Sequence, residues 1–203
     1  MLEEQSRERI LGPSGEGLAA AVYRMRGPNE EPKSAFAPIL SALQDVYPRI
    51  EDIRAERTGT GRLFLVFKER GISQDLGQSN VSDGVMHALA LLLAINGGLG
   101  GDGILVIEEP ENAIHPWSLR SMIRQAQEVR GRQIVLTTHS EIVVNEVTKP
   151  ESLWVVESSD AGTTVTEALH KESALRSIME KTGEKLGDIW LGGGIGGVPG
   201  GEV

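Results

Sequence analysis

The chain has no cysteine, and its 203 residues carry a formal net charge of −9 with a pI near 5.0. Without cysteine there is no disulfide framework and no thiolate metal site, which favours a reducing, cytoplasmic setting. The acidic balance argues against a basic surface over the whole chain of the kind that binds nucleic acid. A net negative charge is still compatible with a local basic patch.

Long apolar runs are also missing. The longest, residues 88–95, is far shorter than the roughly 20 residues that a membrane helix needs. The first residues, Met1 to Gln5, are acidic and lack the basic-then-apolar order of a signal peptide. These features predict a soluble, cytoplasmic protein without a membrane span.

A complete phosphate-binding loop is absent from the sequence. Gly12 and Gly17 have the spacing of the two glycines in GxxxxGK[ST], but Leu18 and Ala19 follow where that motif requires Lys and Ser or Thr. No other stretch of the 203 residues fits this Walker A pattern. We therefore interpret these glycines as a loop that leads into a helix.

Residues 104–107 are the most informative strand of the sequence. Their Ile-Leu-Val-Ile run has no polar alternation, a pattern typical of a strand buried on both faces of a parallel sheet. Glu108 and Glu109 follow at once, at the strand end where open α/β sheets bind ligands, and Pro110 ends the strand. This Walker B-like element predicts one carboxylate that binds Mg²⁺ and a second that deprotonates an attacking water.

A second apolar strand, predicted over residues 133–138, carries His139 and Ser140 at its carboxyl end. Because a right-handed βαβ unit places both strand ends on one edge of the sheet, His139 can reach the γ-phosphate of a nucleotide bound there. The other histidines that we weighed, His87 in an apolar helix and His170 beside a late strand, are interpreted as structural.

Ser82, Asp83 and Gly84 precede an apolar helix predicted over residues 85–95. One interpretation is an N-cap at Ser82 followed by a loop glycine, which is common. The other is an anion site, because a helix N-terminus offers unpaired N–H groups and a positive dipole end to phosphate.

The remaining patterns predict an α/β fold with mainly parallel core strands flanked by helices, plus β-hairpins. Predicted helices cover 18–25, 34–47, 117–130, 141–147 and 171–181, hairpins cover 53–70 and 153–167, and a polar loop covers 72–80. We expect one domain over residues 1–191 and a flexible glycine-rich tail over 192–203.

Three motifs occur in a fixed order: SDG at residues 82–84, EEPE at 108–111 followed by His115, and TTHS at 137–140. In this order they resemble the C-terminal lobe of a P-loop, ABC-type ATPase head. The resemblance is closest to the AAA-like predicted ATPases related to SMC and OLD proteins. It extends to both ends of the sequence and therefore covers most of the chain.

This resemblance implies ATP and Mg²⁺ as cofactors and assigns roles by position. Ser82, Asp83 and Gly84 match the signature motif, which engages the γ-phosphate of a nucleotide held by the opposite subunit. Glu108 resembles the acid on the Mg²⁺ side, although an Asp is commoner there, and Glu109 resembles the catalytic base.

The resemblance extends these roles to the dimer interface. Asn112 and His115 fall in the D-loop, which crosses that interface, and His139 resembles the switch histidine. The partner implied is a second ATPase head in a homodimer, or an N-terminal lobe that carries Walker A. Nucleic acid would be bound through the complete complex, in DNA maintenance or defence.

Two other functions are weighed against this ATPase. The first is a non-catalytic interaction or dimerisation module without turnover. The second is a metal-dependent hydrolase that uses Glu108, Glu109, Glu111 and His115, and we rank it lowest because no second acidic cluster supplies the remaining ligands.

Overall fold

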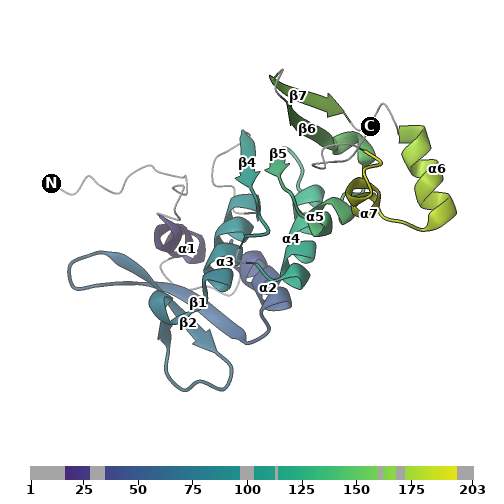
Figure 1. The fold of residues 1–203 in the computed structure, drawn as a ribbon. Helices are drawn as coiled ribbons and strands as arrows, with labels where there is room; N and C mark the ends of the chain where they lie inside the picture. Colours follow the sequence, from purple (N-terminus) through teal and green to yellow (C-terminus); the bar gives the residue numbers. More distant parts are fainter. Residues whose placement is uncertain are drawn as a thin grey trace. The chain divides into compact units, whose positions relative to one another are not determined.

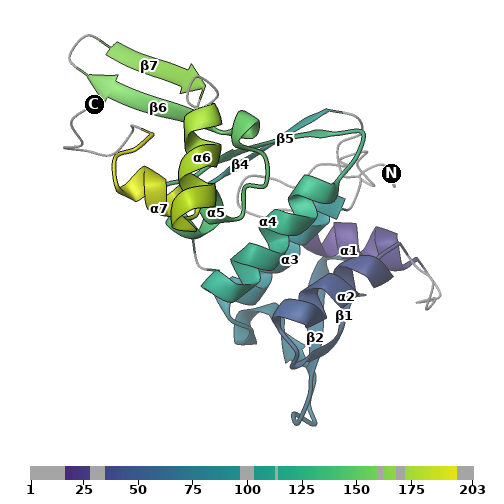
Figure 2. The same ribbon diagram turned by 90° about the vertical axis from the view of Figure 1, so that its right-hand side faces the viewer.

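The structure is a computed structural model, and it describes residues 17–27, 35–96, 103–112, 114–159, 162–167 and 172–195 (Figures 1 and 2). The chain folds into two units, Met1–Leu136 and Thr137–Val203. Most of the Gly12–Gly17 loop, the glycine loop before residue 103, His170 and residues 196–203 lie outside the described residues. None of the described helices is long and apolar enough to cross a membrane.

The first unit combines helices with two small sheets. Its helices are α1 (Leu18–Arg26), α2 (Ala37–Val46), α3 (Asp83–Asn96), α4 (Pro116–Glu128) and the short 3₁₀ helix η1 (Gln78–Asn80). Its strands are β1 (Ile50–Arg57), β2 (Leu63–Glu69), β3 (Leu76–Gly77), β4 (Ile104–Glu108) and β5 (Gln133–Thr137), whose last residue passes into the second unit. The expected mixed α/β fold is confirmed: β4 and β5 pair and are connected through α4, as in a parallel βαβ unit.

The predicted first hairpin is present as the antiparallel pair β1–β2. The last residues paired at the loop end of this hairpin are Arg57 and Leu63. The N–H of Thr58 donates to the carbonyl oxygen of Arg62 at 2.8 Å and closes the loop. Gly61 supplies the left-handed backbone that this turn needs, at φ +84°. Phe67 is fully buried, so the hairpin brings one apolar face to the core.

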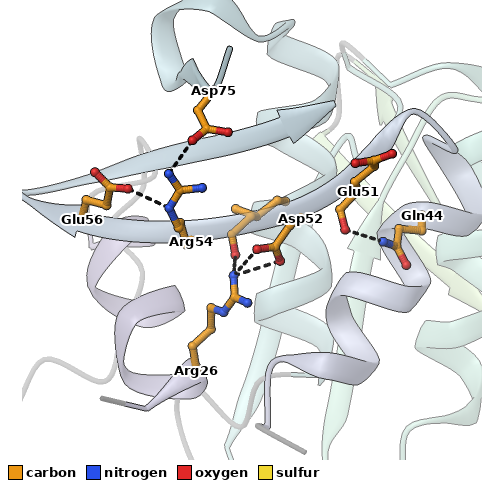
Figure 3. A network of polar contacts seen from close by, with 8 residues as sticks. Arg26, Gln44, Glu51, Asp52, Arg54, Glu56 and Asp75 are labelled. Atoms are coloured by element: carbon orange, nitrogen blue, oxygen red, sulfur yellow. Dashed lines mark hydrogen bonds and ion pairs between the residues drawn. The ribbon is translucent and has the colours of Figure 1, made fainter. Parts of the chain in front are cut away.

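Ion pairs attach α1 and the segment after β2 to strand β1 (Figure 3). Arg26 at the end of α1 pairs with Asp52 at 2.9 Å and also donates to the carbonyl of Ile53. Arg54 bonds Asp75 and Glu56, each at 2.7 Å. The hydrogen bond from Arg54 to Asp75 raises the pKa of the Arg54 guanidinium above its ordinary value.

The prediction of a polar loop over residues 72–80 is wrong for its last part. Leu76 and Gly77 form β3, which pairs with Phe67 and Val66 of β2. The backbone N–H of Leu65 also donates to the side-chain oxygen of Gln78 at 3.3 Å. A two-residue strand has no periodicity of its own, so its pairing is set by the neighbouring strand rather than by a local pattern.

Helix α3 is the centre of the first unit's core. It is apolar on all sides, and Leu89, Leu92 and Leu93 are completely buried. Helices α2 and α4 pack against it. Arg132, in the turn that leads from α4 to β5, donates to the carbonyl oxygen of Ala94 in the last turn of α3 at 2.6 Å. This bond satisfies a carbonyl that the helix itself leaves open.

The prediction that β4 and β5 are buried on both faces is wrong for the described residues. Ile107 is only 7% exposed, but Ile104 and Val106 are 63% and 60% exposed, and Val135 of β5 is 40% exposed. Alternate strand residues share a face, so Ile104 and Val106 lie on the same side of β4. The described residues leave this side open to solvent, and we call Ile104, Val106 and Val135 the open face.

The second unit contains α5 (Glu141–Asn145), the 3₁₀ helix η2 (Pro150–Ser152), β6 (Trp154–Ser159), β7 (Gly162–Glu167), α6 (Glu172–Thr182) and α7 (Leu186–Leu191). Strands β6 and β7 form the predicted second hairpin, with Val156 opposite Val165. Its core consists of Val144, Val155, Leu175, Leu186, Ile189 and Ile195.

Helix α7 was not predicted, because its six residues span fewer than two turns. The backbone N–H of Lys185 donates to Asp188 Oδ2 at 2.9 Å, which caps the start of the helix and lowers the pKa of the Asp188 carboxyl. Ile195 lies within the segment expected as a tail, but it is buried against this core.

Candidate functional site

The candidate site is built around the turn that follows β4. Glu109 has φ +43°, and it is the only non-glycine residue with positive φ in the described part of the chain. The N–H of Asn112 donates to the carbonyl oxygen of Glu109 at 3.0 Å, which closes a four-residue turn with Pro110 in its second position. Proline suits that position because its φ is already fixed near the required value. A left-handed glutamate is strained, and such strain concentrates at functional sites.

The two strand-end carboxylates have different surroundings. Glu108 is exposed and, by the alternation of the strand, lies on the side of Ile104 and Val106. Glu109 is half-buried, and its Oε2 accepts a hydrogen bond from Asn112 Nδ2 at 2.9 Å. The sequence predicted both glutamates but missed this contact. The sequence did contain a pattern typical of such a turn, with Pro110 directly after Glu109 and the amide of Asn112 two residues after the proline.

His115 occupies the N-cap of α4. Its Nδ1 accepts a hydrogen bond from the N–H of Trp117 at 3.3 Å, and Pro116 takes the first helical position. This cap is a local structural role that the sequence interpretation did not include. The interfacial role of His115 stays a prediction.

Residues Ser82, Asp83 and Gly84 stand at the start of α3. The carbonyl oxygen of Ser82 accepts the N–H groups of Val85 at 3.1 Å and Met86 at 3.2 Å, the backbone pattern of an N-cap. The Ser82 and Asp83 side chains are exposed. Asp83 in the first turn interacts favourably with the helix dipole, so a phosphate at this end would have to accommodate its negative charge.

The starts of α3 and α4 lie at one end of the first unit. The bond from Arg132 to Ala94 joins the turn after α4 to the last turn of α3, and the two packed helices have similar lengths of 13 and 14 residues. Their N-termini therefore lie together at the opposite end, which Figure 2 shows as two helices side by side. Because α4 returns antiparallel to β4, the carboxyl end of β4 points to this end as well. The structure thus brings residues 82–84 and 108–115 to one end of the unit.

His139 is exposed and lies in the second unit, directly after β5. The N–H of Ser140 donates to Thr138 Oγ1 at 3.0 Å, which turns the chain from β5 into α5. Since Glu109 belongs to the first unit, the expected meeting of His139 with the strand-end carboxylates stays a prediction.

The carboxylates at the turn after β4 fit an Mg²⁺ ion that is shared with a substrate better than a metal ion whose ligands all come from the protein. Within the described ranges, no group of three or more His, Asp and Glu side chains could hold an ion. Mg²⁺ is usually bound through one or two carboxylates together with substrate phosphates and water. Glu108, an exposed carboxylate at the strand end, suits that kind of shared site.

A sequence model of the family described as "AAA domain, putative AbiEii toxin, Type IV TA system" matches residues 13–145. No curated protein sequence matches the chain. The family match covers α1 to α5, and with them every candidate residue named above.

Solved heads of Smc proteins are similar in structure. The SmcHead bound to the C-winged helix domain of ScpA has a TM-score of 0.53 at 12% identity, over 65% of this chain and 41% of that chain. The Smc head domain with a coiled coil and joint from Pyrococcus yayanosii has 0.51 at 14%, over 74% and 29%. The Smc head with an extended coiled coil from Pyrococcus furiosus, bound to the C-terminal domain of ScpA, has 0.51 at 13%, over 71% and 37%. The chain therefore shares its fold with part of each of these three solved chains and covers less than half of the length of each.

Proposed function

The chain belongs to this AAA-domain family, and we propose that it is the half of an ABC-type ATPase head that carries the signature, Walker B and switch-histidine residues. An ATPase-type domain related to SMC heads is supported by the family match and the shared fold. The observation that carries the finer proposal is Glu109, a half-buried residue with a left-handed backbone at the carboxyl end of β4, whose carboxylate accepts a hydrogen bond from Asn112.

In this proposal the protein's own groups perform the proton transfer and hold the phosphate. Glu109 accepts a proton from the attacking water, and His139 donates a hydrogen bond to the γ-phosphate. The start of α3 at Ser82 offers backbone N–H groups to the phosphate of a nucleotide on the opposite subunit. Bound Mg²⁺, beside Glu108, would neutralise charge on the phosphates. Rate enhancement then comes from positioning and electrostatic stabilisation, as in other phosphoryl transfers.

The proposal requires a partner that supplies Walker A. No stretch of the 203 residues matches GxxxxGK[ST]. We therefore place the phosphate-binding loop on an N-terminal lobe or a separate chain, with ATP between two heads. We propose that Asn112 and His115 face the second head. DNA maintenance or defence is the proposed output, and the description of the family as a putative toxin is compatible with defence.

Phosphate release tests this proposal. The chain by itself should release phosphate from Mg·ATP only at the uncatalysed level, and adding a polypeptide that carries the matching Walker A lobe should start Mg²⁺-dependent turnover. His139→Ala in the completed head should slow hydrolysis more than it weakens ATP binding. Turnover by the isolated chain, or none by the completed head, would contradict the proposal.

A non-catalytic interaction module is the second candidate, and the open face favours it. Parallel strands are normally covered on both sides, whereas Ile104 and Val106 are each at least 60% exposed. Apolar groups exposed to this degree at alternate positions of one strand, and therefore on one face, favour a surface that another chain or segment covers. Such covering requires no ATP turnover.

Sedimentation of the purified chain tests whether the open face associates. We expect dimers or larger species at micromolar concentration, because an uncovered apolar strand pair is a template for association. Val106→Lys should shift the chain towards monomer without unfolding it, since that side chain is 60% exposed. Val156→Lys is the matched control: Val156 is also 60% exposed, but it lies on β6 of the second unit. A monodisperse wild-type monomer would contradict association through β4 and β5.

A further inference from the structure

We propose that Asn112 is a positioning residue for Glu109, and that its side-chain amide fixes the direction in which the Glu109 carboxylate accepts a proton. The inference rests on the proposed function for the role of Glu109 as general base. It adds a task for Asn112 that differs from contact with a second head, because it acts within one chain.

The backbone of the turn holds the two residues together before any ligand arrives. The N–H of Asn112 donates to the carbonyl oxygen of Glu109 at 3.0 Å, and Pro110 between them is buried. Ile114, two residues further on, is 6% exposed and anchors the exit of the turn in the core. The backbone of Asn112 is therefore held next to Glu109 by the turn, although its side chain is exposed.

A second bond joins the same two residues through their side chains. Asn112 Nδ2 lies 2.9 Å from Glu109 Oε2, a normal distance for an amide donating to a carboxylate. A glutamate side chain has several rotatable bonds, and this hydrogen bond restricts them. Precise placement of a catalytic base matters because small displacements of reacting groups lower rates strongly.

The chemistry of the donor suits this task. An amide carries no charge, so it can orient a carboxylate without adding a cation that would weaken it as a base. A lysine or arginine in the same place would orient the carboxylate as well but would stabilise its ionised form more strongly than an uncharged donor does. Glu109 accepts this bond at a position where its own backbone is left-handed, at φ +43°.

Steady-state kinetics of the completed ATPase test the role. Asn112→Ala should lower kcat about 10-fold, the effect of one hydrogen bond to a charged group, while the KM for ATP stays within about twofold. Asn112→Asp keeps the shape but replaces the donor with a second carboxylate, so its loss of kcat should be larger. Asn112→Gln keeps an amide donor and should recover part of the rate.

A matched control is Gln125→Ala, which removes an amide from α4 that bonds only locally to Ser121. It should leave kcat unchanged. If Asn112→Ala also leaves kcat unchanged in an active enzyme, or if KM rises as much as kcat falls, Asn112 does not position the base. If the wild-type head has no turnover at all, the proposed function fails instead.

An NMR measurement tests the contact between Asn112 and Glu109 without requiring ATPase activity. In the 203-residue chain, the side-chain amide protons of Asn112 should give a shifted NMR signal that Glu109→Ala returns to the ordinary position. The exposed Glu128 at the end of α4 provides the control, and Glu128→Ala should leave the signal in place. A signal that does not respond to Glu109→Ala would overturn the inference.

Discussion

Glu109→Gln is expected to lower the kcat of the completed ATPase by about 10²- to 10⁴-fold, the usual contribution of a general base, while ATP binding is retained. The amide keeps the size and shape of the carboxylate but cannot accept a proton from water. In the proposed arrangement, ATP that is bound and not hydrolysed would keep two heads together, so the variant should accumulate as a nucleotide-bound dimer.

Phosphate release and retention of nucleotide by the dimer are the two measurements for Glu109→Gln. Glu128→Gln is the matched control. It makes the same chemical change at an exposed position at the end of α4, and it should leave turnover intact. Turnover of Glu109→Gln at the wild-type rate would show that the base is elsewhere. Glu108 or Glu111 would then be the next candidate.

Gly187→Ala is expected to destabilise the second unit by about 1–3 kcal/mol, the range for overpacking a filled site. A Cβ at this position would lie 2.6 Å from the carbonyl oxygen of Glu141 and 2.8 Å from Asn145 Oδ1. The N–H of Gly187 also donates to Asn145 Oδ1 at 2.8 Å, so α7 cannot withdraw without losing that bond. The gain in helix propensity from alanine, about 1 kcal/mol, offsets only part of this clash.

Denaturant unfolding followed through Trp190, which packs beside the core of the second unit, measures the effect of Gly187→Ala. Gly192→Ala is the matched control at the end of the same helix. A Cβ there would meet its nearest atom, the carbonyl oxygen of Asp188, at an ordinary 3.5 Å, and the stability should change little. Equal stability of Gly187→Ala and the wild type would mean that α5 and α7 are not packed as closely as described.

The sequence predicted those parts of the fold in which local pattern and tertiary environment agree. The loop between β1 and β2 has the glycines that a tight turn needs, and α3 is apolar on all sides and buried. The order of the motifs at Ser82, Glu108 and His139 pointed to the family that the match over residues 13–145 supports. Similarity to SMC heads was predicted correctly in the same way.

Other features depend on contacts that a local pattern does not contain. The Ile-Leu-Val-Ile run of β4 predicts burial on both faces, but burial also requires something to cover each face, and the described residues cover only one. Strand β3 forms because β2 offers hydrogen bonds, and α7 forms because Asn145 and the core of the second unit hold it. The left-handed backbone of Glu109 is set by its turn and is invisible in a hydrophobic pattern.

We propose that this chain carries the residues that act on the γ-phosphate of ATP but lacks the loop that binds the nucleotide. Calorimetric titration of the 203-residue chain with Mg·ATP tests it most directly. We predict no binding of micromolar affinity, because Leu18 and Ala19 stand where the phosphate-binding Lys and Ser or Thr would be. Micromolar binding of ATP by this chain alone would show that it contains a nucleotide-binding loop of its own, against this proposal.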